Sequence, residues 1–276
     1  MVPFDAYTLT KSQQMIADYI SKNNHLVPYL TELDIARACS VSIATVSRFW
    51  SAVGHQNLKS FKHSFKDYDG TITPAKKMES AVEKYEHTYL NHMFQSSIGF
   101  IEETLKHLSM HNFEQSVETI SQSATIHIYS SGPANGLASL LQFRLRRFNV
   151  QVTTLAQSGH EIYEDLIHIG SKDTIVLFGF VHFSPEIQVL LDYASKRMIK
   201  TILLTDLLVS PMVNQATYVL YTERGEMGEF HSMVAPTALI ESLVVAVGKN
   251  IGPSALDKLH ELHTLRKTYS NKLPKK

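Results

Sequence analysis

Residues 33–65, LDIARACSVSIATVSRFWSAVGHQNLKSFKHSF, restrict the fold of this 276-residue chain more than any other stretch. Their apolar spacing predicts two short helices joined by the turn Ser40–Ser42, which is the arrangement of a helix–turn–helix. Ala36 is small enough for two crossing helices to pack closely, and Val41 fills the angle between them. The Ser42 hydroxyl can cap the second helix by accepting a hydrogen bond from an amide of its first turn.

The second helix of this motif is expected over Ile43–Val53. Val46 and Phe49 lie three residues apart and form one buried stripe, and Gly54 is a natural C-terminal stop. A recognition helix places its exposed N-terminal half in the major groove of DNA. In this chain that half presents Ile43, Ala44, Thr45, Ser47 and Arg48.

Positive charge concentrates around this motif although the chain as a whole is neutral. The 26 basic residues balance 26 acidic ones, yet residues 36–66 contain no acidic residue. The basic residues of that range are Arg37, Arg48, Lys59, Lys62 and Lys66. A local basic excess is typical of a phosphate-contacting surface, so we expect double-stranded DNA to be bound by the recognition side chains together with Ser42, Lys59 and Lys62. The alternative is a helical dimerisation module with a solvated basic face.

Two further helices complete the bundle expected over residues 1–75. The first covers residues 10–23, where Thr10 and Gln13 are spaced as a capping box. Its buried face comprises Met15, Ile16, Tyr19 and Ile20. The other follows Gly54, with Leu58, Phe61 and Phe65 inward and Lys59, Lys62 and Lys66 outward. Thr31 can cap the helix that precedes the turn.

Residues 76–112 are expected to form a linker and a long helix. The preceding segment 67–74 carries Gly70 and Pro74 and predicts a connection. Helical spacing then continues over residues 75–108, and residues 96–99 are the place where the helix could break. Its apolar side chains Met78, Val82, Tyr85 and Tyr89 can pack on a dimer partner or on the C-terminal domain of the same chain.

From residue 113 to 250 short apolar segments alternate with helical ones, which predicts a doubly wound α/β domain. The expected strands are 124–129, 150–155, 173–180, 200–205 and 217–221, and the expected helices are 137–148, 160–169, 185–197 and 233–247. Such a five-stranded parallel sheet is covered by helices on both faces. Residues 251–276 form a basic tail that is expected to be helical.

Cysteine, histidine and hydropathy patterns exclude several classes of site. The single cysteine, Cys39, rules out an internal disulfide and suits a reducing cytoplasm. No run approaches the ~20 apolar residues of a membrane span, and the N-terminus lacks the pattern of a secretory signal. The closest histidine pairs, His107/His111 and His260/His263, have no partners in a zinc-like arrangement. We expect a cytoplasmic protein with no metal, cofactor or membrane partner.

Two loops of the α/β domain are candidates for ligand binding. Ligands of doubly wound sheets bind beyond the carboxyl ends of the strands, and residues 130–135 and 179–184 follow such ends. Both loops lead into helices whose N-terminal amides attract anions. The candidate ligand-binding residues are Ser130, Ser131, Gly132, Asn135 and Ser184. The alternative is that these residue types only form turns.

Both halves together resemble the RpiR/MurR group of bacterial transcription regulators. The resemblance is strongest at SVSIATVSRFWSAVGHQNLKSFK, and looser at IHIYSSGPANGLA, DTIVLFGF and KTILLTD. It implies an N-terminal helix–turn–helix joined to a C-terminal sugar isomerase (SIS) domain, with a sugar phosphate or related metabolite modulating operator binding in carbohydrate metabolism. It also implies a homo-oligomer, either a dimer or a tetramer.

The phosphate-binding loops depart from the pattern of that group. The first runs Gly-x-Gly-x-Ser in the family, and here those positions are Ser130, Gly132 and Ala134; the second runs Ser-x-x-Gly-x-Thr, and here those positions are Gly179, His182 and Ser184. Each lost hydroxyl removes a hydrogen bond to a charged group, worth roughly 1.5–3 kcal/mol, so two losses weaken binding about a hundredfold or more. Either neighbouring polar residues compensate, the ligand is not a simple sugar phosphate, or the domain mainly oligomerises.

The competing function is a sugar-phosphate isomerase, which needs a base and a proton donor beside the substrate carbon. Glu229 and His231 are the only pair we nominate for that chemistry. An isomerase has no use for a basic helical bundle, so we expect no catalytic residue and no enzyme activity.

Overall fold

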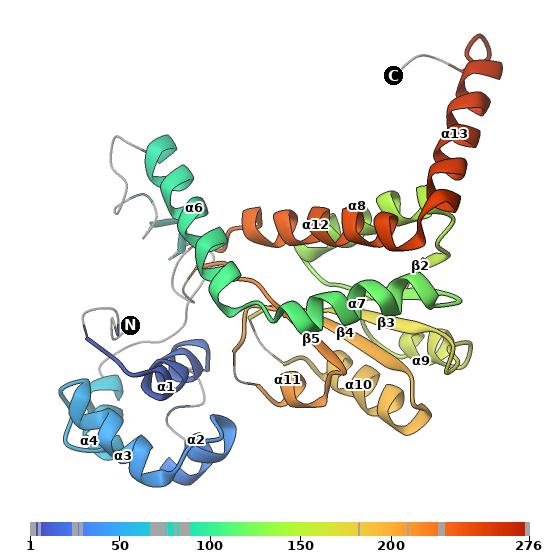
Figure 1. Cartoon of the computed structure of the whole chain (residues 1–276). Coiled ribbons are helices and arrows are strands. Elements are labelled where there is room, and N and C mark those ends of the chain that lie inside the picture. Colours follow the sequence, from blue (N-terminus) through green and yellow to red (C-terminus); the bar gives the residue numbers. More distant parts are fainter. Residues whose placement is uncertain are drawn as a thin grey trace.

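The computed structural model describes residues 4, 7–23, 27, 30–66, 75, 77–79, 82, 89–181, 183–208, 210–225 and 230–273. They form an N-terminal helical bundle and a C-terminal α/β domain, and the long helix α6 (Tyr89–His107) lies next to the α/β domain (Figure 1). Predictions that concern His182, Glu229, Tyr85, the linker 67–74 and the side chains of Phe65 and Lys66 lie outside the described residues.

The bundle consists of α1 (Lys11–Lys22), α2 (Glu32–Ala38), α3 (Ile43–Ala52) and α4 (Leu58–Lys66). Three of these helices begin at the predicted caps. Thr10 and Gln13 form a capping box at α1, Thr31 forms one at α2, and the Ser42 hydroxyl accepts from an amide of α3. These bonds satisfy amides that the helix itself leaves without acceptors, which fixes where each helix starts.

An aromatic cluster fills the interior of the bundle. Trp50 is fully buried, with its ring 5.1 Å from that of Phe49 and 4.9 Å from that of Phe61. Ile16 and Ile20 of α1 are buried in the same cluster. The sequence pattern identified Phe49 and missed Trp50, although Trp50 lies four residues after Val46 and therefore on the same helical face.

The C-terminal end of α3 also follows the prediction. Gly54 has φ +80°, a conformation that side chains with a Cβ rarely adopt. This turn allows the His55 amide to donate to the Trp50 carbonyl at 2.8 Å. The polypeptide therefore leaves α3 at the residue expected and turns into α4.

The α/β domain contains a five-stranded parallel sheet, as predicted. The strands are β1 (Ile126–Tyr129), β2 (Val152–Thr154), β3 (Thr174–Phe178), β4 (Lys200–Thr205) and β5 (Tyr218–Tyr221), in the order β2-β1-β3-β4-β5. All five residues of β3 are buried, which is expected of a strand covered on both faces.

Helices cover both faces of this sheet. One apolar cluster joins the sheet to α7 (Met110–Gln122), α8 (Ala134–Leu145) and α12 (Val234–Ile251). The opposite cluster joins it to α9 (Glu161–Leu166), α10 (Pro185–Arg197) and α11 (Pro211–Gln215). A short 3₁₀ helix, Arg146–Phe148, follows α8, and α13 (Pro253–Thr268) projects from the domain near the C-terminus (Figure 1).

Three details differ from the expectations. The helix α6 runs unbroken through residues 96–99, where Gly99 keeps helical geometry and the Ser97 hydroxyl donates to the Met93 carbonyl. The helix α7 was not predicted, since its polar sequence MHNFEQSVETISQ hides the buried pair Val117 and Ile120. The five-residue α11 was also missed.

Among the described residues, only α12 is long and apolar enough to cross a membrane. Leu239, Ile240, Leu243 and Val247 of this helix are buried in the apolar cluster between α12 and the sheet. One side of α12 therefore packs against the sheet, while Val234 and Val245 of the same helix are exposed.

Candidate functional site

The exposed face of α3 carries the predicted recognition residues. Ser42, Ile43, Ala44, Ser47 and Arg48 are exposed, whereas Thr45 is half-buried. Ile43 is 49% exposed, so an apolar side chain is accessible at the start of α3. An exposed apolar group at the start of a recognition helix is suited to contact a thymine methyl group.

Two local hydrogen bonds hold this face in place. The Ser42 hydroxyl accepts from the Thr45 amide at 3.1 Å and lies 2.8 Å from the Thr45 hydroxyl. The Arg48 Nε donates to the Ala44 carbonyl at 3.1 Å, which keeps the guanidinium against α3. The first turn of α3 is thus ordered before any partner binds.

The predicted lysines differ in their surroundings. Lys59 is exposed on α4, as expected. Lys62 is half-buried, and its Nζ donates to the Leu30 carbonyl at 2.6 Å. Lys62 therefore ties α4 to the residue before the cap of α2, and this bond uses one of its three N–H donors.

The α/β domain has a topological switch point between β1 and β3. These strands are adjacent in the sheet, with Tyr129 opposite Leu177. The helix that follows β1 covers one face, and the helix that follows β3 covers the other. The loops 130–133 and 179–184 therefore diverge from neighbouring strand ends, where doubly wound folds bind their ligands.

Several predicted ligand residues already have partners within the chain. The Ser130 hydroxyl, which is buried, donates to Asn135 Oδ1 at 2.8 Å. The Ser184 hydroxyl caps α10 by accepting from the Ile187 amide at 3.3 Å. Ser131 is exposed, and Gly132 has φ +55°. The structure thus brings the five residues to one edge of the sheet. The bond between Ser130 and Asn135, the cap at Ser184 and the positive φ of Gly132 are also local structural roles, as the alternative interpretation expects.

The departure at Gly179 has a steric explanation. A Cβ at this position would lie 2.9 Å from both Leu203 Cδ1 and Met212 Sδ. A serine there would require both side chains to move, so glycine suits the way α11 packs against the strand ends.

A pocket of about 210 Å³ opens between the N-terminal ends of α9 and α10. It is lined by Gly159, His160, Ile162, Tyr163, Pro185, Glu186 and Val189. Pro185 directly follows Ser184, so the pocket adjoins the second predicted loop. The pocket cannot be recognised in the sequence, because its lining residues come from two helices separated by a strand.

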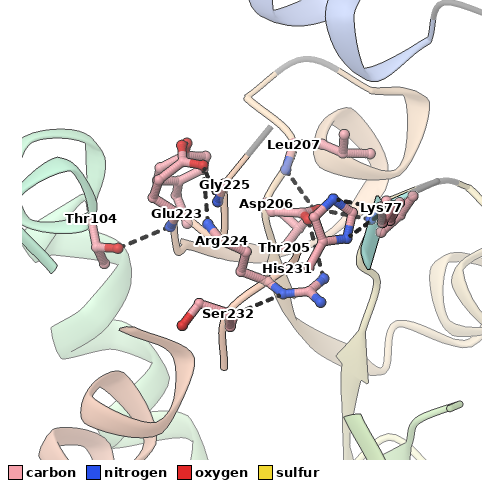
Figure 2. A network of polar contacts seen from close by, with 12 residues as sticks. Lys77, Thr104, Thr205, Asp206, Leu207, Glu223, Arg224, Gly225, His231 and Ser232 are labelled. Atoms are coloured by element: carbon pink, nitrogen blue, oxygen red, sulfur yellow. Dashed lines mark hydrogen bonds and ion pairs between the residues drawn. The ribbon is translucent and has the colours of Figure 1, made fainter. Parts of the chain in front are cut away.

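A second polar cluster lies at the ends of β4 and β5 (Figure 2). Arg224 Nη1 lies 3.2 Å from Asp206 Oδ2, and both side chains are about 95% buried. The guanidinium also donates to the Ser232 carbonyl at 3.4 Å and lies 4.3 Å from the centre of the Phe180 ring. Burial lowers the pKa of Arg224 and the charge of Asp206 opposes this shift.

Asp206 also reaches the second predicted loop. Its Oδ1 accepts from the Val181 amide at 2.8 Å. Val181 has φ +71°, which is rare for a β-branched residue. The conformation of the loop that contains Phe180 and Val181 therefore depends on a carboxylate from the end of β4.

The nominated isomerase residue His231 lies at the same edge. Lys77 Nζ lies 3.3 Å from Nε2 and 3.4 Å from Nδ1 of its ring (Figure 2). Burial and the nearby charge of Arg224 lower the pKa of Lys77. Lys77 comes from the segment between the two domains, so that segment contacts the carboxyl edge of the sheet.

These features define a protein that joins a helix–turn–helix bundle to a doubly wound α/β domain. Residues 5–71 match the helix-turn-helix domain of the rpiR family, and residues 119–246 match the SIS domain. The chain has both domains in that order and belongs to the RpiR family of helix–turn–helix proteins.

The chain matches most of one curated relative and less than half of another. An uncharacterized HTH-type transcriptional regulator of Haemophilus influenzae is 25% identical over 232 residues, which are 77% of this chain and 75% of that protein. The bifunctional protein glk of Burkholderia thailandensis is 24% identical over 253 residues, which are 90% of this chain and 39% of that protein.

Two solved structures share the fold. The sugar isomerase domain of an RpiR transcription factor from Sphaerobacter thermophilus has a TM-score of 0.58 and 23% identity, covering 62% of this chain and 96% of that one. The NanR protein of Vibrio vulnificus, complexed with ManNAc-6P, has a TM-score of 0.61 and 21% identity, covering 94% of each chain. At these identities the likeness establishes the fold, including the order of the two domains.

Proposed function

We propose that this protein is a transcription regulator that binds double-stranded operator DNA through α3. The observation that carries the proposal is the exposed N-terminal half of α3, ordered by the Ser42 cap and set in a region without acidic residues. In this proposal Arg48 and Lys59 contact phosphates, whereas Ile43, Ala44 and Thr45 face base edges. Family membership and the regulator among the relatives support this assignment.

A gel-shift titration tests the assignment of Arg48. We expect Arg48→Ala to weaken binding to operator and to random DNA alike, because a phosphate contact carries no sequence information. The control is Lys196→Ala, which removes an exposed positive charge from α10 of the other domain and should leave DNA binding unchanged. An Arg48→Ala variant that lost only operator preference would contradict the phosphate role and place the guanidinium on a base.

For the α/β domain we propose that a sugar phosphate or a related acidic metabolite binds at the switch point between β1 and β3. The loops 130–135 and 179–184 and the adjoining pocket support this site, and the fold relative NanR is complexed with ManNAc-6P. Thermal-shift screening with sugar phosphates tests it, since a ligand at a hundred times its dissociation constant adds about 2.7 kcal/mol of stability. A screen in which no sugar derivative raises the melting temperature would favour a domain that only oligomerises.

We further propose that the protein acts in the cytoplasm as a homodimer and catalyses no isomerisation. One side of α6 contacts α12 of the same chain, which fits one of the two packing alternatives for the long helix. The other side exposes Leu90, Phe94, Ile98 and Leu105, each at least 49% accessible. An apolar stripe of this length suits a second copy, and two copies fit a palindromic operator with half-sites one helical turn apart.

The proposed absence of isomerase activity has its own test. Turnover of hexose or pentose phosphates in a coupled assay would refute it.

A further inference from the structure

We propose that three consecutive residues after β4, Asp206, Leu207 and Leu208, couple the second ligand loop to the DNA-binding bundle. We call them the coupling loop. Each contacts a different part of the molecule: the ligand loop, the core of the α/β domain, and the bundle. The regulatory purpose of this coupling rests on the function proposed above, but the coupling itself does not depend on any ligand.

The first contact fixes the ligand loop. Asp206 is 3% exposed and accepts the Val181 amide at 2.8 Å while it pairs with Arg224 at 3.2 Å. Because Val181 has φ +71°, its conformation persists only while such contacts hold it. The guanidinium of Arg224 covers the ring of Phe180, which precedes Val181. Displacement of Phe180 or Val181 by a ligand must therefore move Asp206, Arg224 or both.

The second contact makes the coupling loop stiff. Leu207 is 2% exposed and belongs to the apolar cluster of α9, α10 and α11. Its amide donates to the Thr205 hydroxyl at 3.1 Å (Figure 2). A displacement of Asp206 cannot be absorbed by free rotation of Leu207, because that side chain is enclosed.

The third contact reaches the bundle. Leu208 packs against the apolar cluster formed by α1, α2, α3 and α4. Its amide lies 3.4 Å from Asp18 Oδ2, which belongs to α1. Only one residue separates Leu208 from Asp206, so the bundle docks on the same short loop that holds Val181.

The segment between the domains contacts the same cluster. Lys77 lies 3.3 Å from the His231 ring, and the next residue, Ser232, accepts a hydrogen bond from Arg224. The bundle is thus joined to the Asp206–Arg224 pair by two routes, one through α1 and one through Lys77. Packed contacts of this kind switch between discrete arrangements instead of deforming smoothly, and any coupling between the two sites is reciprocal.

Amide hydrogen exchange of the full-length protein without ligand tests the coupling. In Leu208→Ala we expect about tenfold faster exchange in α1 and, in addition, in peptides covering residues 179–181, because loosening one contact lowers the opening free energy of the other. Leu208 packs on the bundle, so this truncation leaves the α/β core intact. Ile167→Ala removes the same three carbons from a 67% exposed site on the α/β domain and should leave both regions unchanged.

The reverse perturbation is Asp206→Asn, which weakens the hold on Val181 and removes the charge that faces Arg224. We expect faster exchange in α1, to which Asp206 is connected through Leu207 and Leu208. If this variant fails to fold, Leu208→Ala alone decides the question. If Leu208→Ala speeds exchange in α1 but leaves exchange at residues 179–181 at the wild-type rate, the inference is overturned. That result would show that the bundle docks on Leu208 without being coupled to the ligand loop.

A DNA titration of the wild-type protein separates the two proposals. If the wild-type protein does not bind DNA, and Leu208→Ala still speeds exchange both in α1 and at residues 179–181, the proposed function is refuted and the coupling is supported. Wild-type protein that binds DNA while Leu208→Ala affects α1 alone would refute the coupling and support the function.

Discussion

Replacing the cap of the recognition helix offers a sharp test of how α3 is held. In Ser42→Ala the Thr45 amide loses its acceptor at 3.1 Å and the hydroxyl pair at 2.8 Å disappears. The site is exposed, so water replaces part of the loss, and the cost for a serine cap is about 1 kcal/mol. The first turn, which carries Ile43, Ala44 and Thr45, should fray.

The protein contains its own probe for this measurement. Its single tryptophan, Trp50, is fully buried inside the bundle, so tryptophan fluorescence reports unfolding of that domain alone. With a urea dependence of ~1 kcal/mol/M for a domain of this size, the midpoint should fall by about 1 M.

The control variant Ser47→Ala should shift the urea midpoint in the opposite direction. Ser47 is also exposed on α3, but it lies inside the helix, where alanine is favoured over serine by roughly 0.5 kcal/mol. Ser47→Ala should therefore raise the midpoint slightly. Equal midpoints for Ser42→Ala and Ser47→Ala would refute the capping argument.

Two further predictions concern the bundle and the exposed stripe of α6. Burial raises the pKa of the Cys39 thiol from 9.0 to about 12. The folded state therefore binds the thiol proton more tightly than the unfolded state does, and this difference stabilises the fold fully below pH 9. The stabilisation declines by up to ~1.4 kcal/mol per pH unit as the pH rises from 9 toward 12. Tryptophan-detected urea titrations at pH 8 and pH 10 should show a larger loss for the wild type than for Cys39→Ala, and equal losses would contradict it. Phe94, which is 66% exposed, lies in the middle of the α6 stripe, so Phe94→Asp should halve the mass measured by sedimentation equilibrium, whereas Ile167→Asp should not. An unchanged mass for Phe94→Asp would remove α6 from the dimer interface.

The sequence predicted the bundle closely because its helix ends are specified locally. Thr10, Thr31, Ser42 and Gly54 each act on amides or carbonyls within a few residues, so their roles can be recognised without a structure. The helix α7 was missed because only a narrow apolar stripe in a polar sequence faces the sheet. Its burial depends on a strand order that local patterns do not contain.

The site was harder to predict because its contacts join distant segments. Asp206 and Arg224 are 18 residues apart and meet only because β4 pairs with β5, with Thr205 opposite Tyr221. The contact between Leu208 and the bundle joins the two domains, so neither domain considered alone predicts it. By contrast, the loops after β1 and β3 were placed correctly, because the doubly wound pattern itself brings those strand ends together.

Whether the bundle binds DNA through the basic face around α3 and α4 can be decided by measuring how salt affects its binding to the DNA upstream of its own gene. Lys59 is exposed and lies on that face, so Lys59→Glu should weaken binding and lower the slope of log Kd against log salt concentration by about one or more. The control Lys196→Glu reverses an exposed charge on α10 and should leave the slope unchanged. Wild-type protein that shows no binding at low salt, or a Lys59→Glu variant with the wild-type affinity and slope, would contradict the account.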